Sequence, residues 1–400
     1  MTWFSALALV GWALVVLMVR LLRRGRYAMF VGVILGIHSL IAVALAPAFA
    51  PILPLYAALN VSVYVNFLAL SRPRMRSLPY RLLVSWPSAF FVGGTLLALP
   101  WALVAAAGFR PLGVWIPYLL GAVGLFQSLT TKREEIDLAL TEHAVTPGTR
   151  VAPYPWGERR VARPLRVVQI SDPHLGPFMS VARLRRIAER AVAADPDLVL
   201  LTGDFLTMES QSDPDLLLHA LAPLKALEGR TFACHGNHDH ESPAVVARAL
   251  AENGIELLVD DARTLVTAAG PVQILGADFT WRDRAAHLAR VCADHPREPG
   301  ALRIVLLHDP TAFKELPAGE GDLVLSGHTH GGQVGLLSLG LSWTFLRFFG
   351  DRIPDHGFWA RGTDRMWIHR GTGHYGFPLR LGVPAEESML RIHTSRTSPA

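Results

Sequence analysis

The first third of the chain is apolar and has no acidic side chain. Residues 1–130 include nine Arg but no Lys, Asp or Glu. A transmembrane helix needs about 17–25 mostly apolar residues, and it satisfies its own backbone hydrogen bonds in lipid. Five stretches meet or approach this length: Trp3–Val19, Ala28–Ala48, Ile52–Leu70, Leu82–Ala107 and Val114–Leu129. Residues 1–130 are therefore predicted to form an all-α transmembrane bundle of about five spans.

The excess basic charge belongs to this segment alone. The whole chain has a formal net charge of +5, but residues 131–400 contain 29 basic and 33 acidic residues. Nucleic-acid binding depends on neutralising phosphates with Lys and Arg, and residues 131–400 have no such excess. The charge is thus a signal for membrane orientation, and no nucleic-acid partner is expected.

Two Arg clusters predict the orientation of the bundle. The loops Arg20–Arg26 and Arg72–Arg81 carry four Arg each, so they should face the cytoplasm. Counting Val114–Leu129 as a separate span then places residues 131–400 in the cytoplasm, whereas an interfacial Val114–Leu129 would place them on the other side. A cleaved signal peptide at Trp3–Val19 is disfavoured because the positive charges follow the apolar run. The prediction is a multi-pass protein of a bacterial-type inner membrane.

Polar motifs follow short apolar runs in residues 131–400, which are predicted to be one domain. The runs Val167–Ile170, Leu198–Leu201, Ile304–Leu307 and Leu323–Leu325 predict buried strands of an α/β sheet. Apolar residues at helical spacing from Val181 to Ala191 predict a helix between the first two strands. The motifs are Asp172-x-His174, Gly203-Asp204, Gly236-Asn237-His238-Asp239, His308 and Gly327-His328-Thr329-His330.

Seven side chains in these motifs are of metal-ligand type: Asp172, His174, Asp204, Asn237, His308, His328 and His330. Side chains at the carboxyl ends of adjacent parallel strands converge on one crevice. One structural zinc needs only four ligands, whereas seven fit two ions about 3.5–4 Å apart if Asp204 bridges them. Mixed nitrogen and oxygen ligands suit divalent Mn, Fe or Zn.

Taken together and in this order, the motifs resemble those of the calcineurin-like metallophosphoesterases, from about Ile136 to the C-terminus. The resemblance implies a layered α/β/β/α sandwich and a metal-dependent hydrolase that attacks phosphorus with a hydroxide between the two ions. One ion would be held by Asp172, His174, Asp204 and His330, and the other by Asp204, Asn237, His308 and His328. His238 would protonate the leaving oxygen, with Asp239 as its orienting partner.

An apolar segment, Leu336–Phe349, follows the last motif and carries a single charge, Arg347. It is too short to span a bilayer as a helix. It could be buried core, but a membrane-dipping lip beside the active site is favoured, since the protein is already tethered to a membrane. The interfacial residues would be Trp343, Phe345, Phe348 and Phe349.

The spans, the lip and the late stretches Arg370–Gly373 and Arg380–Glu386 resemble a transmembrane branch of the family. The wider group includes enzymes that cleave UDP-2,3-diacylglucosamine, which implies a phospholipid or a lipid-linked pyrophosphate as substrate. Arg380 is a candidate for binding the substrate phosphate. An ion pair of Arg380 with Glu386 or Glu387 is the alternative.

Three functions follow from these observations. A membrane-anchored phosphohydrolase is favoured. A phosphodiesterase or nuclease acting on nucleotides or nucleic acid is disfavoured by the net negative charge of residues 131–400. A non-catalytic membrane receptor or scaffold is disfavoured because all seven ligand-type residues and His238 are present. His235 and His240, which flank the Gly236–Asp239 motif, are expected to be surface or supporting residues, although contact with a substrate phosphate stays open.

Overall fold

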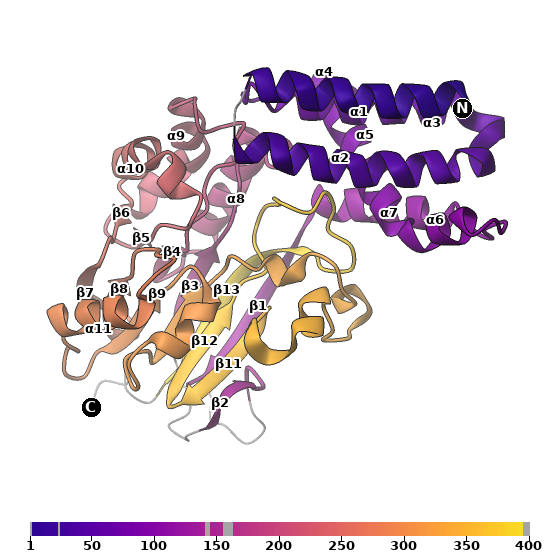
Figure 1. Ribbon diagram of the computed structural model, residues 1–400. Helices are drawn as coiled ribbons and strands as arrows, with labels where there is room; N and C mark the ends of the chain where they lie inside the picture. Colours follow the sequence, from indigo (N-terminus) through magenta and orange to yellow (C-terminus); the bar gives the residue numbers. More distant parts are fainter. Residues whose placement is uncertain (1, 23–24, 141–144, 155–162, 395–400) are drawn as a thin grey trace. The chain divides into compact units, whose positions relative to one another are not determined.

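The computed structural model describes residues 2–22, 25–140, 145–154 and 163–394 (Figure 1). Its contacts divide the chain into two compact units. The helical unit comprises Met1–Leu129 with two short later segments, Met208–Ser212 and Tyr375–Leu381, and the remaining chain forms the second unit. The predicted domain boundary at residue 130 stays a prediction, since both short segments lie beyond it.

The helical unit consists mainly of apolar helices. Its helices are α1 Trp3–Leu22, α2 Arg26–Leu45, α3 Leu53–Ala69, α4 Leu78–Tyr80, α5 Trp86–Leu97, α6 Leu99–Ala106 and α7 Ile116–Ser128. A 3₁₀ segment, Ala46–Ile52, joins α2 to α3, and Pro47 and Pro51 within it cannot donate α-helical hydrogen bonds. Large apolar side chains such as Leu21, Met29 and Leu83 are exposed on this unit, as expected of a lipid-facing surface.

Fewer helices pass a membrane-span criterion than the five stretches predicted. By length and composition, Trp3–Leu22 and Tyr27–Ala69 qualify among the described residues, and the pair Leu78–Leu97 and Leu99–Ala106, bent by 56°, would be a third. The fifth stretch contains only the 13-residue α7. The described helices therefore support membrane association without fixing the number of spans.

The segment Tyr27–Ala69 turns back on itself. His38 Nε2 and Asn60 Oδ1 lie 3.0 Å apart, although a straight helix rising about 1.5 Å per residue would place them roughly 33 Å apart. Ser39 Oγ and Tyr64 OH, at 2.7 Å, pair in the same way. The two predicted stretches in this segment thus form a hairpin, and its buried polar residues make hydrogen bonds between helices.

The second unit is built on two β-sheets. The six-stranded sheet has the order β1 Thr131–Ala139, β13 Ala385–His393, β3 Leu165–Ile170, β4 Leu198–Leu201, β5 Thr231–Ala233 and β6 Glu256–Leu257. The seven-stranded sheet has the order β2 Val145–Arg150, β11 Gly357–Gly362, β12 Asp364–Ile368, β10 Leu323–Ser326, β9 Leu302–Leu306, β8 Gly270–Gly276 and β7 Asp261–Thr267. Strands β3 to β6 are parallel, as are β8, β9, β10 and β12.

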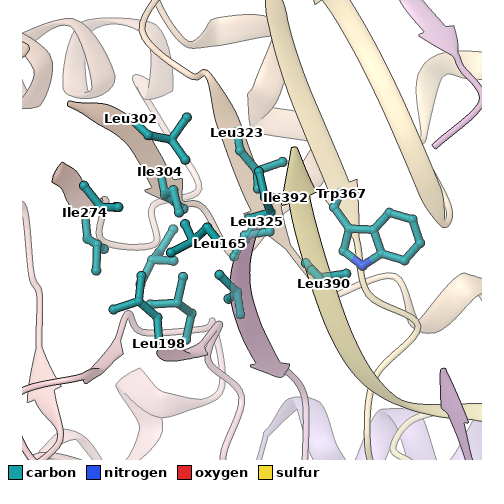
Figure 2. Packing of buried hydrophobic residues seen from close by; sticks show 14 of the residues in the cluster. Leu165, Leu198, Ile274, Leu302, Ile304, Leu323, Leu325, Trp367, Leu390 and Ile392 are labelled. Carbon is teal, nitrogen blue, oxygen red and sulfur yellow. The ribbon is translucent and has the colours of Figure 1, made fainter. Parts of the chain in front are cut away.

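The main hydrophobic core contains side chains from both sheets (Figure 2). Leu165, Leu198 and Leu390 from one sheet and Ile304 and Leu325 from the other belong to this buried cluster. The four apolar runs of the sequence occupy β3, β4, β9 and β10, so their assignment as buried strands is confirmed.

Helices cover the outer faces of the two sheets. Helix α8, Val181–Ala193, buries the predicted stripe Leu184, Ile187, Ala188 and Ala191. Helices α9 Asp215–Leu221 and α10 Pro243–Glu252 follow along the chain. Helix α11, Arg284–Asp294, packs Leu288 and Val291 into a second cluster with Val305 and Val324 of the seven-stranded sheet. The predicted layered α/β/β/α fold is confirmed.

Candidate metal centre

The seven ligand-type residues follow the carboxyl ends of five strands: Asp172 and His174 follow β3, Asp204 follows β4, Asn237 follows β5, His308 follows β9, and His328 and His330 follow β10. The strands β3, β4 and β5 are parallel neighbours in one sheet, and β9 and β10 are parallel neighbours in the other. Parallel strands end at the same edge of a sheet, so each sheet gathers its polar residues at one place.

The first group of ligand-type atoms comes from Asp172, His174 and His330, which are all buried. The Nε2 atoms of His174 and His330 lie 3.2 Å apart. Oδ1 of Asp172 lies 3.4 Å from Nε2 of His330 and 3.9 Å from Nε2 of His174. Two imidazoles and a carboxylate thus surround a volume suited to one divalent ion.

The second group comes from Asp204, His308 and His328. Nε2 of His308 lies 3.3 Å from Oδ2 of Asp204 and 3.2 Å from Nδ1 of His328. Nδ1 of His308 donates a hydrogen bond to the carbonyl oxygen of Thr202 at 2.6 Å. This bond fixes the ring orientation and directs Nε2 into the group, as second-sphere carbonyls do for metal-binding histidines.

Asp204 lies between the two groups. Its Oδ2 is 3.6 Å from Nε2 of His174 in the first group and 3.3 Å from Nε2 of His308 in the second. Its Oδ1 accepts a hydrogen bond from the backbone N–H of His238 at 2.8 Å, which holds the carboxylate in place. This position would allow the Asp204 carboxylate to be shared by two cations, which stays a prediction.

The side-chain oxygen of Asn237 bears on whether these residues suit metal ions. Its side-chain Oδ1 is buried and has no hydrogen-bond partner among the described residues. Burying an unsatisfied polar atom costs about 1–3 kcal/mol, so a cation at this oxygen would relieve a real penalty. The donor set of imidazole, carboxylate and amide oxygen fits Mn, Fe or Zn, and the element is left open by the ligands.

Five ligand-type residues have left-handed backbone conformations, with φ of 49° at Asp172, 43° at His174, 57° at Asp204, 66° at His328 and 51° at His330. Such conformations in non-glycine residues cost of order 1–3 kcal/mol each and persist where surrounding contacts impose them. Here the backbone N–H of Asp172 donates to the carbonyl of Gly203 at 3.0 Å, and that of His328 donates to Oδ1 of Asp172 at 3.0 Å. The strain therefore coincides with the candidate centre.

The motif glycines allow the loops to approach closely. A Cβ at Gly203, whose φ is 81°, would lie 2.2 Å from the backbone nitrogen of Gly236. A Cβ at Gly236 would lie 2.2 Å from Oδ1 of Asp204. Glycine is required at both positions because the loops after β4 and β5 touch through their backbones.

The pKa is shifted in opposite directions for His174 in the first group and His308 in the second. Burial lowers the pKa of His174 to about 3, which keeps its imidazole in the neutral, metal-binding form. Burial also acts to lower the pKa of His308, but the adjacent Asp204 carboxylate raises it to about 10. A divalent ion in the second group would replace that proton as the partner of Asp204.

His238 is placed beside the first group, with its ring centroid 5.6 Å from that of His174. Its Nδ1 is hydrogen-bonded to Oε1 of Glu241 at 2.8 Å. Burial acts to lower the pKa of His238, but the Glu241 hydrogen bond and the Asp204 charge raise it overall. The imidazolium form, which can donate a proton, thus extends to higher pH than for an ordinary histidine.

Asp239 has a different position from the one expected for a partner of His238. Its buried carboxylate accepts backbone hydrogen bonds from Asp204 and Gly236 at 2.7 Å and from Phe205 at 2.9 Å. Burial and the neighbouring Asp204 charge raise its pKa to about 6. Asp239 thus braces the loops that hold Asp204, and the carboxylate that orients His238 is Glu241, which sequence reasoning missed.

Arg380 groups with the helical unit. Its backbone N–H donates to Oγ of Ser128 at 2.8 Å, and the residue is fully buried. The two glutamates proposed as its alternative partners have other arginine partners, since Glu386 pairs with Arg370 at 2.9 Å and Glu387 with Arg190 at 2.7 Å. A role for Arg380 in substrate binding stays a prediction.

The apolar segment Leu336–Phe349 is exposed, so its alternative as buried core is not supported. Its 3₁₀ turns are Leu337–Leu339 and the start of Phe345–Arg352. Exposed fractions reach 74% at Leu339 and 72% at Phe348. The rings of Trp343 and Phe345 contact that of Phe348, with centroids 5.3 and 5.7 Å apart. We call this segment the apolar lip.

The apolar lip is joined to the loop that carries His328 and His330. Thr344 Oγ1 donates to Oδ2 of Asp355 at 2.6 Å, and Thr329 Oγ1 donates to the carbonyl oxygen of Asp355 at 2.7 Å. The backbone N–H of Phe345 also donates to the carbonyl of Val334 at 2.8 Å. The lip is therefore fixed at its base to the candidate centre.

Comparison with known proteins gives consistent matches. A family model described as calcineurin-like phosphoesterase matches residues 165–332, which include all seven ligand-type residues. Phosphodiesterase YaeI of Escherichia coli is 28% identical over 237 residues, covering 58% of this chain and 83% of that protein. The uncharacterized metallophosphoesterase YkoQ of Bacillus subtilis is 32% identical over 241 residues, covering 57% of this chain and 83% of that protein.

A relative in animals combines the same kind of domain with a membrane region. The transmembrane protein with metallophosphoesterase domain of Bos taurus is 28% identical over 253 residues. The match covers 58% of this chain but only 53% of the bovine protein.

Proposed function

This chain belongs to the calcineurin-like metallophosphoesterases, and from that premise we propose that it is a membrane-anchored phosphohydrolase with two metal ions and a lipid-linked substrate. The observation that carries the proposal is Asp204, whose carboxylate lies within 3.6 Å of both histidine groups. Two ions on either side of it would clamp the attacking and leaving oxygens of a displacement at phosphorus. The relative named as a phosphodiesterase supports a phosphodiester bond as the target.

The residues of the chain then have separate tasks. Asp172, His174 and His330 would hold one ion, Asn237, His308 and His328 the other, and Asp204 both. When bound, the ions supply an activated water and neutralise charge on the phosphoryl oxygens. His238, held by Glu241, donates a proton to the departing oxygen. Arg380 stays a candidate for binding the substrate phosphate.

The apolar lip supports a substrate presented by a membrane. Its exposed aromatic side chains suit the interface between lipid head groups and acyl chains. A lipid-linked phosphoester or pyrophosphate, such as UDP-2,3-diacylglucosamine or a phospholipid, carries both the apolar part and the phosphorus that this arrangement would need. The lip would hold the acyl part while the phosphorus reaches the metal centre.

Replacing aromatic side chains of the apolar lip should lower the hydrolysis of lipid substrates but not that of soluble substrates. Changing Trp343, Phe345 and Phe348 together to Ser is expected to lower hydrolysis of a lipid pyrophosphate in mixed micelles by at least tenfold. Each fully buried large apolar side chain contributes roughly 1.5–3 kcal/mol, so partial burial of three in lipid is enough for that effect. Hydrolysis of a small soluble aryl phosphodiester should be unchanged.

Val266→Ser is the matched control, because Val266 is an 83% exposed apolar side chain on β7, outside the lip. It should leave both activities intact. An equal loss of both activities in the triple variant would show that the lip supports the fold and does not bind lipid.

The same proposal places the catalytic domain in the cytoplasm of a bacterial-type cell, with the protein in the inner membrane. The support is the four Arg in each of the loops Arg20–Arg26 and Arg72–Arg81. A reporter fused after Thr131 should be active in the cytoplasm, and one fused after Ala48 should be active outside. Periplasmic activity of the Thr131 fusion would overturn this topology.

A substrate comparison tests the function itself. The full chain, purified in detergent with Mn²⁺, should hydrolyse a lipid pyrophosphate faster than an aryl phosphodiester and should leave single-stranded DNA intact. Rapid cleavage of DNA would favour the nuclease alternative. A protein that binds metal but hydrolyses none of the three would favour the receptor or scaffold alternative.

A further inference from the structure

A third group of ligand-type side chains lies outside the two groups around Asp204. It consists of His235, His240 and Asp278, whose nearest nitrogen and oxygen atoms all lie within 4.8 Å of one another. Nδ1 of His235 is 3.0 Å from Oδ1 of Asp278, and Nε2 of His240 is 3.1 Å from the same oxygen. The two imidazole rings are 5.0 Å apart between centroids.

The spacing of this group matches that of a metal site. Nitrogen and oxygen ligands at about 2.0–2.1 Å from a tetrahedral zinc ion are separated from each other by roughly 3.3 Å. The contacts of 3.0 and 3.1 Å at Asp278 are close to this separation. They also resemble the contacts of His330 in the first metal group, which are 3.2 Å to His174 and 3.4 Å to Asp172.

Three separate elements bring these residues together. His235 follows β5, His240 lies in the 3₁₀ turn Asp239–Glu241, and Asp278 follows β8. Asp278 is held from both sides, because Oδ1 accepts from the backbone N–H of Phe279 at 2.9 Å and its own N–H donates to Oδ1 of Asp260 at 2.8 Å. The fold therefore positions Asp278 and the buried His235, and the more exposed His240 completes the group.

The group has one buried and one exposed imidazole. His235 is only 7% exposed, and its Nδ1 faces Oδ1 of Asp278. The contacts that the group makes with Asp278 converge on the single oxygen Oδ1. His240 is more than one-third exposed, so an ion from solvent can reach the group.

We propose that His235, His240 and Asp278 form a third divalent-cation site, of the two-histidine, one-carboxylate kind that binds Zn²⁺ and keeps an open coordination position. Nδ1 of His235, Nε2 of His240 and Oδ1 of Asp278 are its ligands. The ring of Phe279, next to Asp278, lies 6.1 Å from that of His308 and 6.2 Å from that of His328. The open position is available to water or to an anionic oxygen of a bound molecule.

Metal stoichiometry tests this site independently of hydrolysis. The full chain without a histidine tag is stripped with chelator in detergent, equilibrated with Zn²⁺ and freed of loose metal by gel filtration. Elemental analysis should give three Zn²⁺ per chain for the wild type and two for both His240→Gln and Asp278→Asn. The control His219→Gln, which changes an exposed histidine on α9, should keep three.

The result that overturns the site is a wild type with two Zn²⁺ per chain, or a His240→Gln variant that still holds three. His240 is partly exposed, so its replacement should not disturb the fold even if that of Asp278 does. In an Asp204→Asn background, His240→Gln should remove one further ion. This last comparison separates failure of the third site from failure of the two-metal proposal.

Discussion

Asp204→Asn is expected to lose turnover by about 10³-fold or more, the scale seen when a group that stabilises the transition state is removed. The substitution keeps the size of the side chain but removes the negative charge between the two groups. Oδ2 of Asp204 lies 3.6 Å from Nε2 of His174 and 3.3 Å from Nε2 of His308, so both ions would lose a ligand. Elemental analysis should show at most one ion remaining in the dinuclear centre.

Asp213→Asn is the matched control, because Asp213 is exposed and its Oδ1 accepts a local hydrogen bond from the backbone N–H of Asp215 at 3.1 Å. It should have the wild-type rate and metal content. An Asp204→Asn protein with both ions tightly bound and a near-normal rate would refute the bridging role.

His238→Ala should keep both ions of the dinuclear centre yet lose about 10²–10⁴-fold in rate on a substrate with a poor leaving group, the usual contribution of a general acid. With a nitrophenolate leaving group, which departs without a proton, the loss should be much smaller. Steady-state kinetics on the two substrates and elemental analysis make the comparison. An equal loss on both substrates would contradict the acid role.

Glu241→Gln tests the acid role of His238 without removing its imidazole. The Glu241 hydrogen bond raises the pKa of His238, and the acid form is lost as pH rises through that pKa. Without the carboxylate the pKa falls, so the decline of kcat/KM on the basic side should begin at lower pH. A profile with an unchanged basic side would assign the proton to another group.

The strands and the clustering of the ligand-type residues could be predicted because their signals are local. Strands β3, β4, β9 and β10 are short apolar runs, and every ligand-type residue except Asn237 follows such a run within a few positions, as with Asp204 after β4. Parallel strands then bring these positions to one edge of each sheet, which needs only the fold class. The same logic explains why glycines precede Asp204 and Asn237, where the loops pass in contact.

Side-chain directions and distant pairings could not be predicted in this way. Asp239 and Glu241 are two carboxylates in one turn, and only the turn geometry shows that Glu241 faces the His238 ring. Asp278 lies more than 35 residues beyond His240, so no motif joins them. Exposure of the apolar lip depends on tertiary packing, which composition does not determine.

The helical unit shows a limit of a different kind. The apolar stretches contain helices, but length alone does not reveal the hairpin within Tyr27–Ala69 or the 56° bend before α6. The short segment Tyr375–Leu381 groups with these helices. In it, the side chain of Leu379 packs directly against Gly93 and Gly124, which have no side chains of their own. A Cβ at Gly93 would lie 2.2 Å from Cδ1 of Leu379, a contact that no sequence pattern indicates.

The central claim is that two ions share Asp204 and act together on phosphorus. The most direct measurement loads chelator-stripped protein with Mn²⁺ in steps and follows both its electron paramagnetic resonance spectrum and its hydrolysis of an aryl phosphodiester. The account predicts that activity rises together with the signal of a spin-coupled Mn²⁺ pair, as expected of ions about 3.5–4 Å apart. Full activity with only isolated Mn²⁺ signals, or activity that survives complete removal of metal, would contradict it.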